Sequence, residues 1–304
     1  MKRIMILLAA LCFFVLVGCG NQQTNEEQAG SENEGSEETV TYPSETGPVE
    51  IPTDPQRIVA LTNAPNVFAL DGPLVGVDEW TKANPLFAED LKDVPVVSEN
   101  EPESVLAQEP DLIIAGSHME NIDELEKIAP TIVYTWGKLD YLEQQLEIGK
   151  LLNKEEEAQA WIDDFTERAQ AAGDKIKEAY GEDVSVTVFE TDAKNFYVYG
   201  DSWARGTELL YQAMELQMPE KVEADAQEDG YYTLSQEVLP EYAGDFIVLS
   251  KSGDDNTFME SDTWQSIPAV QNDQVIEIDT EEASYSDPIT LEHLLGIFEQ
   301  GFDK

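Results

Sequence analysis

The densest group of side chains suited to ligand binding lies in the stretch Tyr197-Val-Tyr-Gly-Asp-Ser-Trp-Ala-Arg-Gly206. Arg205 carries a permanently charged, planar guanidinium, which can donate several hydrogen bonds to a cluster of partly negative oxygens. Tyr197 and Trp203 can lie flat against the apolar parts of a ligand while their polar edges form hydrogen bonds. The alternative is that Trp203 packs over the edge of a lobe and that Arg205 pairs with a nearby carboxylate. The residues by themselves favour neither interpretation.

Catalytic residues are not expected. Gly200-Asp201-Ser202 resembles the Gly-Asp-Ser block of one group of esterases, but a serine nucleophile needs a base, normally a histidine. The chain has only His118 and His293, and Thr290 stands three residues before His293, where that group has an aspartate. A direct metal site is not expected either, because two distant histidines cannot supply the several ligands that it needs.

The charge of the chain limits its partners. It has 63 acidic and 17 basic residues, for a formal net charge of −46. Such a surface repels nucleic acids and anionic lipid headgroups, so we expect no nucleic-acid partner.

The N-terminal residues have the composition of a secretory signal. Lys2 and Arg3 precede an apolar run that is too short for a stable membrane span, and the run ends in Leu16-Val17-Gly18-Cys19. This end resembles the bacterial lipobox, so residues 1–18 are predicted to be a lipoprotein signal peptide. Cys19 is predicted to carry lipid, such as palmitate. The resulting expectation is a protein anchored on the extracytoplasmic side of the cell membrane, at the surface of a Gram-positive cell.

A polar, acidic stretch follows the predicted anchor. Residues 19–45 are mostly Asn, Gln, Glu, Gly and Ser, which cannot bury a core, so they are predicted to form a flexible tether. Cys12 would leave with the signal peptide, and the mature domain would then have no cysteine for a disulfide or a thiolate site.

The rest of the chain alternates short β-branched runs with helical patterns, which indicates α/β architecture with mainly parallel sheets. An N-terminal lobe is predicted over 46–150, a connecting helix over 151–181 and a C-terminal lobe over 182–304. The predicted strands are Arg57–Leu61, Leu74–Val77, Val94–Val97, Asp111–Ala115, Thr131–Tyr134, Val184–Phe189, Phe196–Tyr199, Asp245–Leu249 and Gln274–Ile278.

One long helix is predicted between the two halves. Apolar residues recur at helical spacing from Lys154 to Tyr180, and Asn153 with Glu156 resembles a capping box at the start. Gly173 is its one weak point. A similar sequence occurs on each side of this helix: Glu103 leads to Asp111, and Glu237 leads to Asp245, with each aspartate opening a buried strand. Two similar lobes joined by one stiff helix explain this internal repeat better than a single sheet, and they place a ligand site between the lobes.

From Thr41 to Phe302 the chain resembles the solute-binding lipoproteins of ABC transporters for iron(III)-siderophores, in particular the ferric-hydroxamate (ferrichrome and ferrioxamine) branch. The sequence segments that resemble the family as a whole are Pro55-Gln-Arg-Ile-Val-Ala-Leu61, Glu103-Ser-Val-Leu-Ala-Gln-Glu-Pro-Asp-Leu-Ile-Ile114, Ile128-Ala-Pro-Thr-Ile-Val133 and Trp264-Gln-Ser-Ile-Pro-Ala-Val270. The mark of the branch is the Tyr197–Gly206 block followed by Leu209-Leu-Tyr-Gln-Ala213. The resemblance implies two Rossmann-like lobes joined by a single long, rigid helix, the class III substrate-binding fold.

The resemblance also implies roles for individual residues. It implies ligand contacts for Tyr197, Trp203 and Arg205, and for Tyr285 in the block Tyr285-Ser-Asp-Pro288. Close relatives have a tryptophan where this chain has Ser284, which predicts a wider or more polar pocket. Glu103 and Glu237 would dock onto arginines of the permease. At the ends of first-lobe strands, further candidate ligand contacts, each of which could equally belong to the core, are Trp80, Tyr134 and Trp136.

Residues and resemblance together predict a monomeric, non-enzymatic component of an ABC importer. It would capture a preformed Fe(III)-hydroxamate siderophore, with no cofactor and no protein ligand to the iron, and deliver it to a permease and its ATPase. Because Arg205 is the only cation identified for the site, a neutral or cationic complex fits better than a highly anionic one. The alternatives are a binder of ferric citrate, a ferric catecholate, haem or cobalamin, and a lipid-anchored serine hydrolase that uses Ser202.

Overall fold

The structure is a computed structural model that describes residues 38–191, 195–253 and 257–303. The first lobe begins with a two-stranded antiparallel hairpin and continues into a four-stranded, wholly parallel sheet in the order β4-β3-β5-β6. Its elements are β1 (Thr39–Ser44), β2 (Gly47–Pro52), β3 (Ile58–Ala60), α1 (Ala64–Ala69), β4 (Leu74–Val77), α2 (Glu79–Ala83), α3 (Pro102–Leu106), β5 (Leu112–Gly116), α4 (Ile122–Leu125), β6 (Thr131–Tyr134) and α5 (Tyr141–Leu151).

The second lobe contains a five-stranded mixed sheet in the order β11-β10-β7-β8-β9. Strands β11, β10 and β7 are parallel, whereas β8 and β9 run antiparallel to their neighbours. Its elements are β7 (Val186–Thr191), β8 (Phe196–Tyr199), η1 (Glu208–Ala213), α7 (Glu220–Ala226), β9 (Tyr231–Leu234), η2 (Gln236–Val238), α8 (Leu239–Tyr242), β10 (Phe246–Lys251), η3 (Thr257–Glu260), α9 (Asp262–Gln265), α10 (Pro268–Gln271), β11 (Val275–Asp279) and α11 (Pro288–Phe302).

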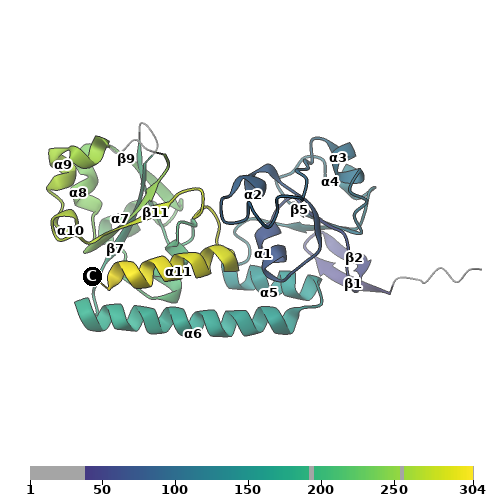
Figure 1. Ribbon diagram of the computed structural model, residues 1–304, viewed down its shortest axis with the longest axis horizontal. Coiled ribbons are helices and arrows are strands. Elements are labelled where there is room, and N and C mark those ends of the chain that lie inside the picture. The colour runs from purple at the N-terminus through teal and green to yellow at the C-terminus, as the bar shows by residue number, and fades with distance from the viewer. Residues whose placement is uncertain (1–37, 192–194, 254–256, 304) are drawn as a thin grey trace, which may run out of the picture. The chain divides into compact units, whose positions relative to one another are not determined.

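The long helix α6 (Glu155–Tyr180) joins the lobes, as the sequence predicts. Its 26 residues rise about 39 Å, and α11 lies alongside it (Figure 1). Ala158 is buried in a core cluster of the first lobe, whereas Phe165 and Ile176 are buried in the core of the second. One continuous helix therefore contributes side chains to both cores, which makes the connection stiff.

The start of α6 differs from the prediction. Asn153 adopts a left-handed conformation (φ 55°) in the turn after α5, and the N-cap position of α6 is Lys154, with no side-chain cap. The capping box predicted at Asn153 and Glu156 is therefore wrong. A capping box is present one helix earlier, where Asp140 and Glu143 begin α5.

The internal repeat has the same structural role in both lobes. The Asp111 carboxylate accepts hydrogen bonds from the backbone N–H groups of Gln56 (2.7 Å) and Arg57 (3.0 Å), just before β3. The Asp245 carboxylate accepts one from the N–H of Ser185 (2.9 Å), just before β7. Each aspartate thus ties the start of its own strand to the start of the neighbouring strand.

Two predicted segments need correction, and three strands were not predicted. The predicted tether 19–45 extends too far, because Thr39–Ser44 form β1. The predicted signal peptide and the rest of the tether up to residue 37, including Cys19, lie outside the described residues. The predicted strand Val94–Val97 contributes only an isolated bridge between Val96 and Val77. Strands β1, β2 and β9 were not predicted, since few of their side chains are buried.

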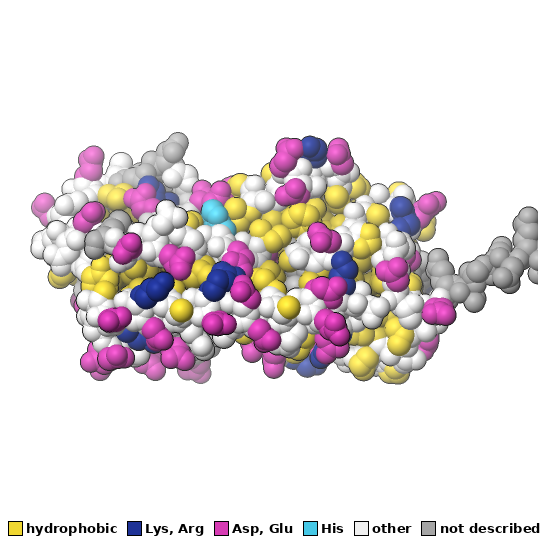
Figure 2. Space-filling model, turned by 60° about the horizontal axis from the view of Figure 1, so that its bottom comes forward, with side chains coloured by type: hydrophobic (Ala, Val, Ile, Leu, Met, Phe, Trp, Pro, Cys, Tyr) yellow, Lys and Arg dark blue, Asp and Glu magenta, His cyan; other side chains and the backbone are white. Residues whose placement is uncertain are grey.

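Carboxylate side chains are scattered over the face shown in Figure 2 and outnumber the lysines and arginines there, as expected from the composition. Among the described residues, no helix combines the length and the apolar character needed to cross a membrane.

Candidate functional site

The loop after β8 holds the predicted ligand residues in an unusual backbone conformation. Three consecutive residues, Ala204 (φ 58°), Arg205 (φ 56°) and Gly206 (φ 78°), have positive φ angles. Only glycine adopts this region without steric cost, so the surrounding contacts must stabilise the loop. At Gly206 a side chain is also excluded by space, because a Cβ would lie 2.7 Å from the ring of Phe298.

Buried polar groups under the loop supply that stabilisation. The N–H of Ala204 donates to the Glu208 carboxylate (3.2 Å), the N–H of Trp203 donates to the Thr207 hydroxyl (2.9 Å), and the N–H of Arg205 donates to the carbonyl of Ala283 (2.8 Å). Glu208 is 6% exposed, and burial raises its pKa despite these hydrogen bonds. The loop is therefore fixed by groups that are themselves buried, which preorganises the Arg205 side chain.

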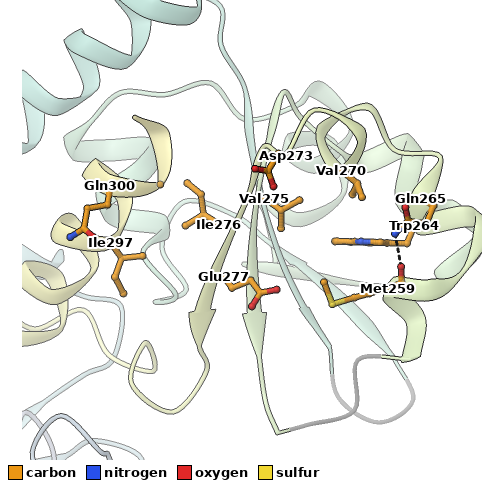
Figure 3. A pocket seen from close by; sticks show the side chains of 11 residues that line it. Met259, Trp264, Gln265, Val270, Asp273, Val275, Ile276, Glu277, Ile297 and Gln300 are labelled. Carbon is orange, nitrogen blue, oxygen red and sulfur yellow. Dashed lines mark hydrogen bonds between the residues drawn. The ribbon is translucent and has the colours of Figure 1, made fainter. Parts of the chain in front are cut away.

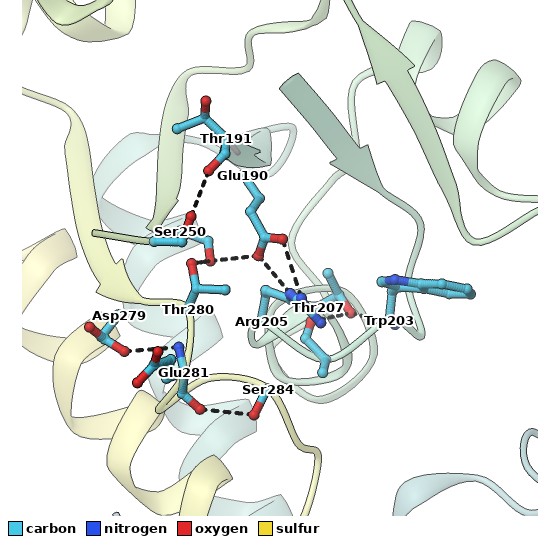
Figure 4. A network of polar contacts seen from close by, with 12 residues as sticks. Glu190, Thr191, Trp203, Arg205, Thr207, Ser250, Asp279, Thr280, Glu281 and Ser284 are labelled. Carbon is cyan, nitrogen blue, oxygen red and sulfur yellow. Dashed lines mark hydrogen bonds and ion pairs between the residues drawn. The ribbon is translucent and has the colours of Figure 1, made fainter. Parts of the chain in front are cut away.

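Arg205 forms a bidentate ion pair with Glu190 at the end of β7. Nε donates to one carboxylate oxygen (2.8 Å) and Nη2 to the other (3.2 Å) (Figure 4). The Glu190 carboxylate also accepts from the Ser250 hydroxyl (2.9 Å), which lies 2.7 Å from the Thr280 hydroxyl. The guanidinium lies 5.3 Å from the centre of the Tyr199 ring. The alternative raised by the sequence, that Arg205 pairs with a local carboxylate, is thus what the structure shows.

This ion pair leaves part of the guanidinium available. Glu190 occupies the edge formed by Nε and Nη2, and among the described residues Nη1 has no protein acceptor. Arg205 can therefore donate hydrogen bonds to a ligand while it remains paired with Glu190.

Aromatic side chains from both lobes meet at Trp203, which lies on the same loop as Arg205. Trp203 lies edge-on to Trp136, which follows β6 in the first lobe, with ring centroids 5.3 Å apart. Tyr231 on β9 lies 5.2 Å from Trp203 and 6.3 Å from Tyr197. Trp136 is 75% exposed, so this cluster presents aromatic surface where the lobes meet.

Tyr285 comes from the second half of the chain but packs on the core of the first lobe. Its hydroxyl lies 3.3 Å from the Thr81 hydroxyl, and its ring lies 6.1 Å from the ring of Phe87. Asp287 and Pro288 begin α11 as N-cap and first helical residue, which fixes the segment that carries Tyr285.

Ser284 joins the same contact between the lobes. The Asn84 side chain donates to the carbonyl of Glu281 (2.8 Å) and lies 3.5 Å from the Ser284 hydroxyl, which in turn donates to that carbonyl (2.8 Å). Asn84 is 2% exposed. The segment 281–285 is thus held against α2 and the residues after it, so the lobes are connected here as well as through α6.

The other two first-lobe candidates, Trp80 and Tyr134, differ in how far their side chains are exposed. Trp80 is 81% exposed, and no contact brings it to the aromatic cluster among the described residues. Tyr134 is 6% exposed in the first-lobe core, and its hydroxyl lies 3.0 Å from that of Tyr42 in β1. Of the two interpretations that the sequence leaves open for Tyr134, the structure favours a core residue, because the N-terminal hairpin covers its side chain.

The two predicted docking glutamates are accessible. Glu103 lies in α3 and Glu237 in η2, and both side chains are exposed. Hydrogen bonds from its own backbone N–H and from Ser235 lower the pKa of Glu237, so this carboxylate is charged at neutral pH.

The residues considered for catalysis lie in separate contacts. The Ser202 hydroxyl donates to Asp201 (3.0 Å), whereas His293 lies 3.1 Å from the Glu282 carboxylate. His118 is exposed. Within the described part of the chain, no group of three or more His, Cys, Asp or Glu side chains could hold a metal ion.

A groove in the second lobe lies away from these residues. It runs along the edge strand β11 and is lined by Trp264, Met259, Val275 and Ile297 among others (Figure 3). None of the predicted ligand contacts lines it.

Two residues of the site were not predicted. Tyr231 belongs to a strand whose sequence, Tyr-Tyr-Thr-Leu, carries the aromatic and β-branched signal of a strand. Glu190 gives no local signal, since it is one of 63 acidic residues and its partner lies 15 positions away.

The chain is similar to known proteins over most of its length. The family model described as periplasmic binding protein matches residues 58–282. Among curated proteins, the iron(3+)-hydroxamate-binding protein FhuD of Bacillus subtilis (strain 168) is 34% identical over 97% of this chain and 96% of its own length. The iron(3+)-hydroxamate-binding protein YxeB of the same organism is 32% identical over 94% of this chain and 92% of its own.

Solved structures show the same fold. FhuD from S. pseudintermedius matches with a TM-score of 0.78 and 35% identity, covering 87% of this chain and 98% of its own. FhuD2 from Staphylococcus aureus with bound ferrioxamine B matches with a TM-score of 0.77 and 31% identity, covering 82% of this chain and 98% of its own. The chain therefore belongs to the periplasmic binding protein family and is similar, over nearly its whole length, to the iron(3+)-hydroxamate-binding members.

Proposed function

We propose that this protein captures an Fe(III)-hydroxamate siderophore between its two lobes and delivers it to an ABC permease with its ATPase. The observation that carries the proposal is the Arg205 guanidinium, which Glu190 fixes and whose Nη1 has no acceptor among the described residues. Its loop also carries Trp203, which joins an aromatic cluster from both lobes. Two curated relatives that it matches are named for the same ligand class, and one solved relative holds ferrioxamine B.

The binding mode involves no covalent chemistry. The siderophore's own oxygens would fill the coordination sphere of the iron, so the protein would supply hydrogen bonds and apolar contact and no metal ligand. Arg205 would donate to the hydroxamate oxygens, with each charge-assisted bond contributing about 1.5–3 kcal/mol. Tyr197, Trp203 and Trp136 would cover the carbon chains of the ligand, and Tyr285 would lie at the wall that Ser284 leaves open.

Delivery would use the acidic docking residues. Glu103 and Glu237 are exposed and occupy equivalent places in the two lobes, because each lies eight residues before the aspartate, Asp111 or Asp245, that precedes a buried strand. A permease that presents one arginine to each lobe would pair with both. We expect the protein to act as a monomer.

The ligand class can be tested by titrating the purified protein with a panel of complexes and following tryptophan fluorescence. Because Trp136 and Trp203 touch each other at the proposed site, an iron complex bound there should quench them strongly. We expect ferrioxamine B and ferrichrome to bind more tightly than ferric citrate or a ferric catecholate. Tighter binding of the catecholate, haem or cobalamin would assign a different ligand.

Membrane attachment is a separate prediction. We infer that Cys19 is acylated and holds the protein on the extracytoplasmic face of the cell membrane. Replacing Cys19 with alanine should release the protein from the membrane fraction into the medium, measured by fractionation and immunoblotting. Ser202→Ala, which leaves the lipobox intact, serves as the control; retention of the Cys19→Ala protein in the detergent-soluble fraction would contradict lipidation.

A further inference from the structure

The ion pair between Arg205 and Glu190 is well shielded from water. The Arg205 side chain is 19% exposed and that of Glu190 is 13% exposed. Glu190 is held in turn by the Ser250 hydroxyl, which lies next to Thr280, so the carboxylate cannot turn away without breaking further hydrogen bonds (Figure 4). The pair is therefore a fixed feature of the site and not a loose surface contact.

The groups that act on this arginine are acidic. Burial disfavours the charged guanidinium, but the bonds and field of Glu190, with Tyr199 and Glu208, outweigh that effect and raise the pKa of Arg205. The arginine thus stays charged, while the carboxylate beside it largely cancels that charge at distances several times longer than the separation of the pair.

The consequence is a site that donates hydrogen bonds without presenting a net positive charge. A ligand oxygen in contact with Nη1 still meets a cationic donor at short range. A complex that carries net negative charge gains nothing from the more distant field, because the attraction to Arg205 and the repulsion from Glu190 nearly cancel. Highly anionic ferric complexes would need uncompensated cations, and this pair does not supply one.

We propose that Glu190 is the residue that determines charge selectivity, by making neutral and cationic ferric complexes bind more tightly than anionic ones. The proposal rests on the proposed function and goes further, because it assigns the selectivity to a residue that need not touch the ligand. Glu190 thus positions the Arg205 guanidinium and offsets its charge in the electrostatic field that acts on the ligand.

The test compares three forms of ferrioxamine B that coordinate iron in the same way but differ in net charge. The terminal amine is free (cationic), acetylated (neutral) or succinylated (anionic). Dissociation constants are measured by fluorescence for the full-length protein and for Glu190→Gln. Glutamine can still accept the bond from Nε but carries no charge. At about 8 Å and an effective dielectric constant near 40, one elementary charge is worth about a fivefold change in affinity. The ratio of anionic to cationic dissociation constants should therefore fall by roughly tenfold or more in Glu190→Gln.

Two further variants separate charge from structure. Glu277→Gln removes an equal charge from an exposed residue of β11 that pairs with Lys251. Among the described residues Glu277 has no bond to Arg205 or Glu190, so this variant should leave the ratio unchanged. Glu190→Asp keeps the charge and alters the geometry. The ratio of anionic to cationic dissociation constants should therefore stay close to that of the parent, even if all three probes bind more weakly. An equal loss of affinity for all three probes in Glu190→Gln would overturn the proposal, because it would show a purely structural role.

The parent protein provides a test that needs no variant to fold. It should bind the cationic and neutral probes at least as tightly as the anionic one. Tighter binding of the anionic probe would overturn the selectivity proposal while leaving the ligand class intact. If the parent bound none of the three, the proposed function itself would be wrong.

Discussion

Replacing Arg205 with glutamine is expected to weaken the binding of ferrioxamine B by about 100-fold or more. Two charge-assisted hydrogen bonds to the ligand would be lost, at about 1.5–3 kcal/mol each, and every 1.4 kcal/mol corresponds to a tenfold change. The variant also leaves the Glu190 carboxylate, 13% exposed, without its cation and close to the ligand oxygens. The measurement is the dissociation constant from fluorescence titration.

Two controls make this result specific. Arg168→Gln also removes an arginine paired with acids, Asp164 on α6 and Glu292 on α11. Arg168 lies on α6 and contacts none of the proposed ligand residues among the described residues, so this variant should leave the affinity unchanged. Arg205→Lys keeps the charge but not the planar fork, so its affinity should lie between those of the parent and the glutamine variant. An Arg205→Gln protein that is folded and binds within about threefold of the parent would contradict the assigned role of this guanidinium.

Replacing Gly173 with alanine is expected to destabilise the protein by about 2–3 kcal/mol. In most helices this change is favourable, because alanine has the higher helix propensity by about 1 kcal/mol. Here a Cβ would lie 2.1 Å from the carbonyl oxygen of Met214, which is backbone and cannot rotate away. The close approach of α6 to the end of η1 requires glycine, and the midpoint of thermal unfolding should fall by roughly 5–10 °C.

Gly296 in α11 provides the matched control. A Cβ at this position meets no atom within 4 Å, so Gly296→Ala should raise stability by about 0.5–1 kcal/mol. The same chemical change should therefore shift the unfolding midpoint in opposite directions in two helices that lie alongside each other. The unfolding midpoints are measured by calorimetry. Equal shifts of the midpoint for the two variants would show that the close contact between α6 and η1 does not require glycine at position 173.

Several parts of the site could be predicted because their signal is local. Tyr197, Trp203 and Arg205 lie within nine residues of one another, so their shared loop follows from the strand that ends at Tyr199. The same holds for Asp287 and Pro288, whose types predict the start of a helix. The pairing of Arg205 with Glu190 could not be predicted, because an abundance of acidic residues leaves the partner undetermined until β7 and the loop are placed together.

The hairpin shows the same limit for secondary structure. Strands β1 and β2 alternate polar residues with Val40, Tyr42, Val49 and Ile51, which is a strand signal, but the acidic composition around them predicts a tether. Only Tyr42 and Ile51 are buried, and Tyr42 is buried because it reaches Tyr134 in β6. The hairpin therefore depends on a contact 92 residues away, which also removes Tyr134 from the list of surface aromatics.

The sequence by itself determined the α/β character, the helix that joins the lobes and the aspartates that begin equivalent strands, because each depends on the periodicity or type of residues close together in the chain. Only the tertiary structure decided which carboxylate neutralises Arg205, that Trp136 of one lobe meets Trp203 of the other, and that segment 281–285 packs on the first lobe. These are contacts between distant residues, and their geometry is set by how the two lobes pack and not by any local preference.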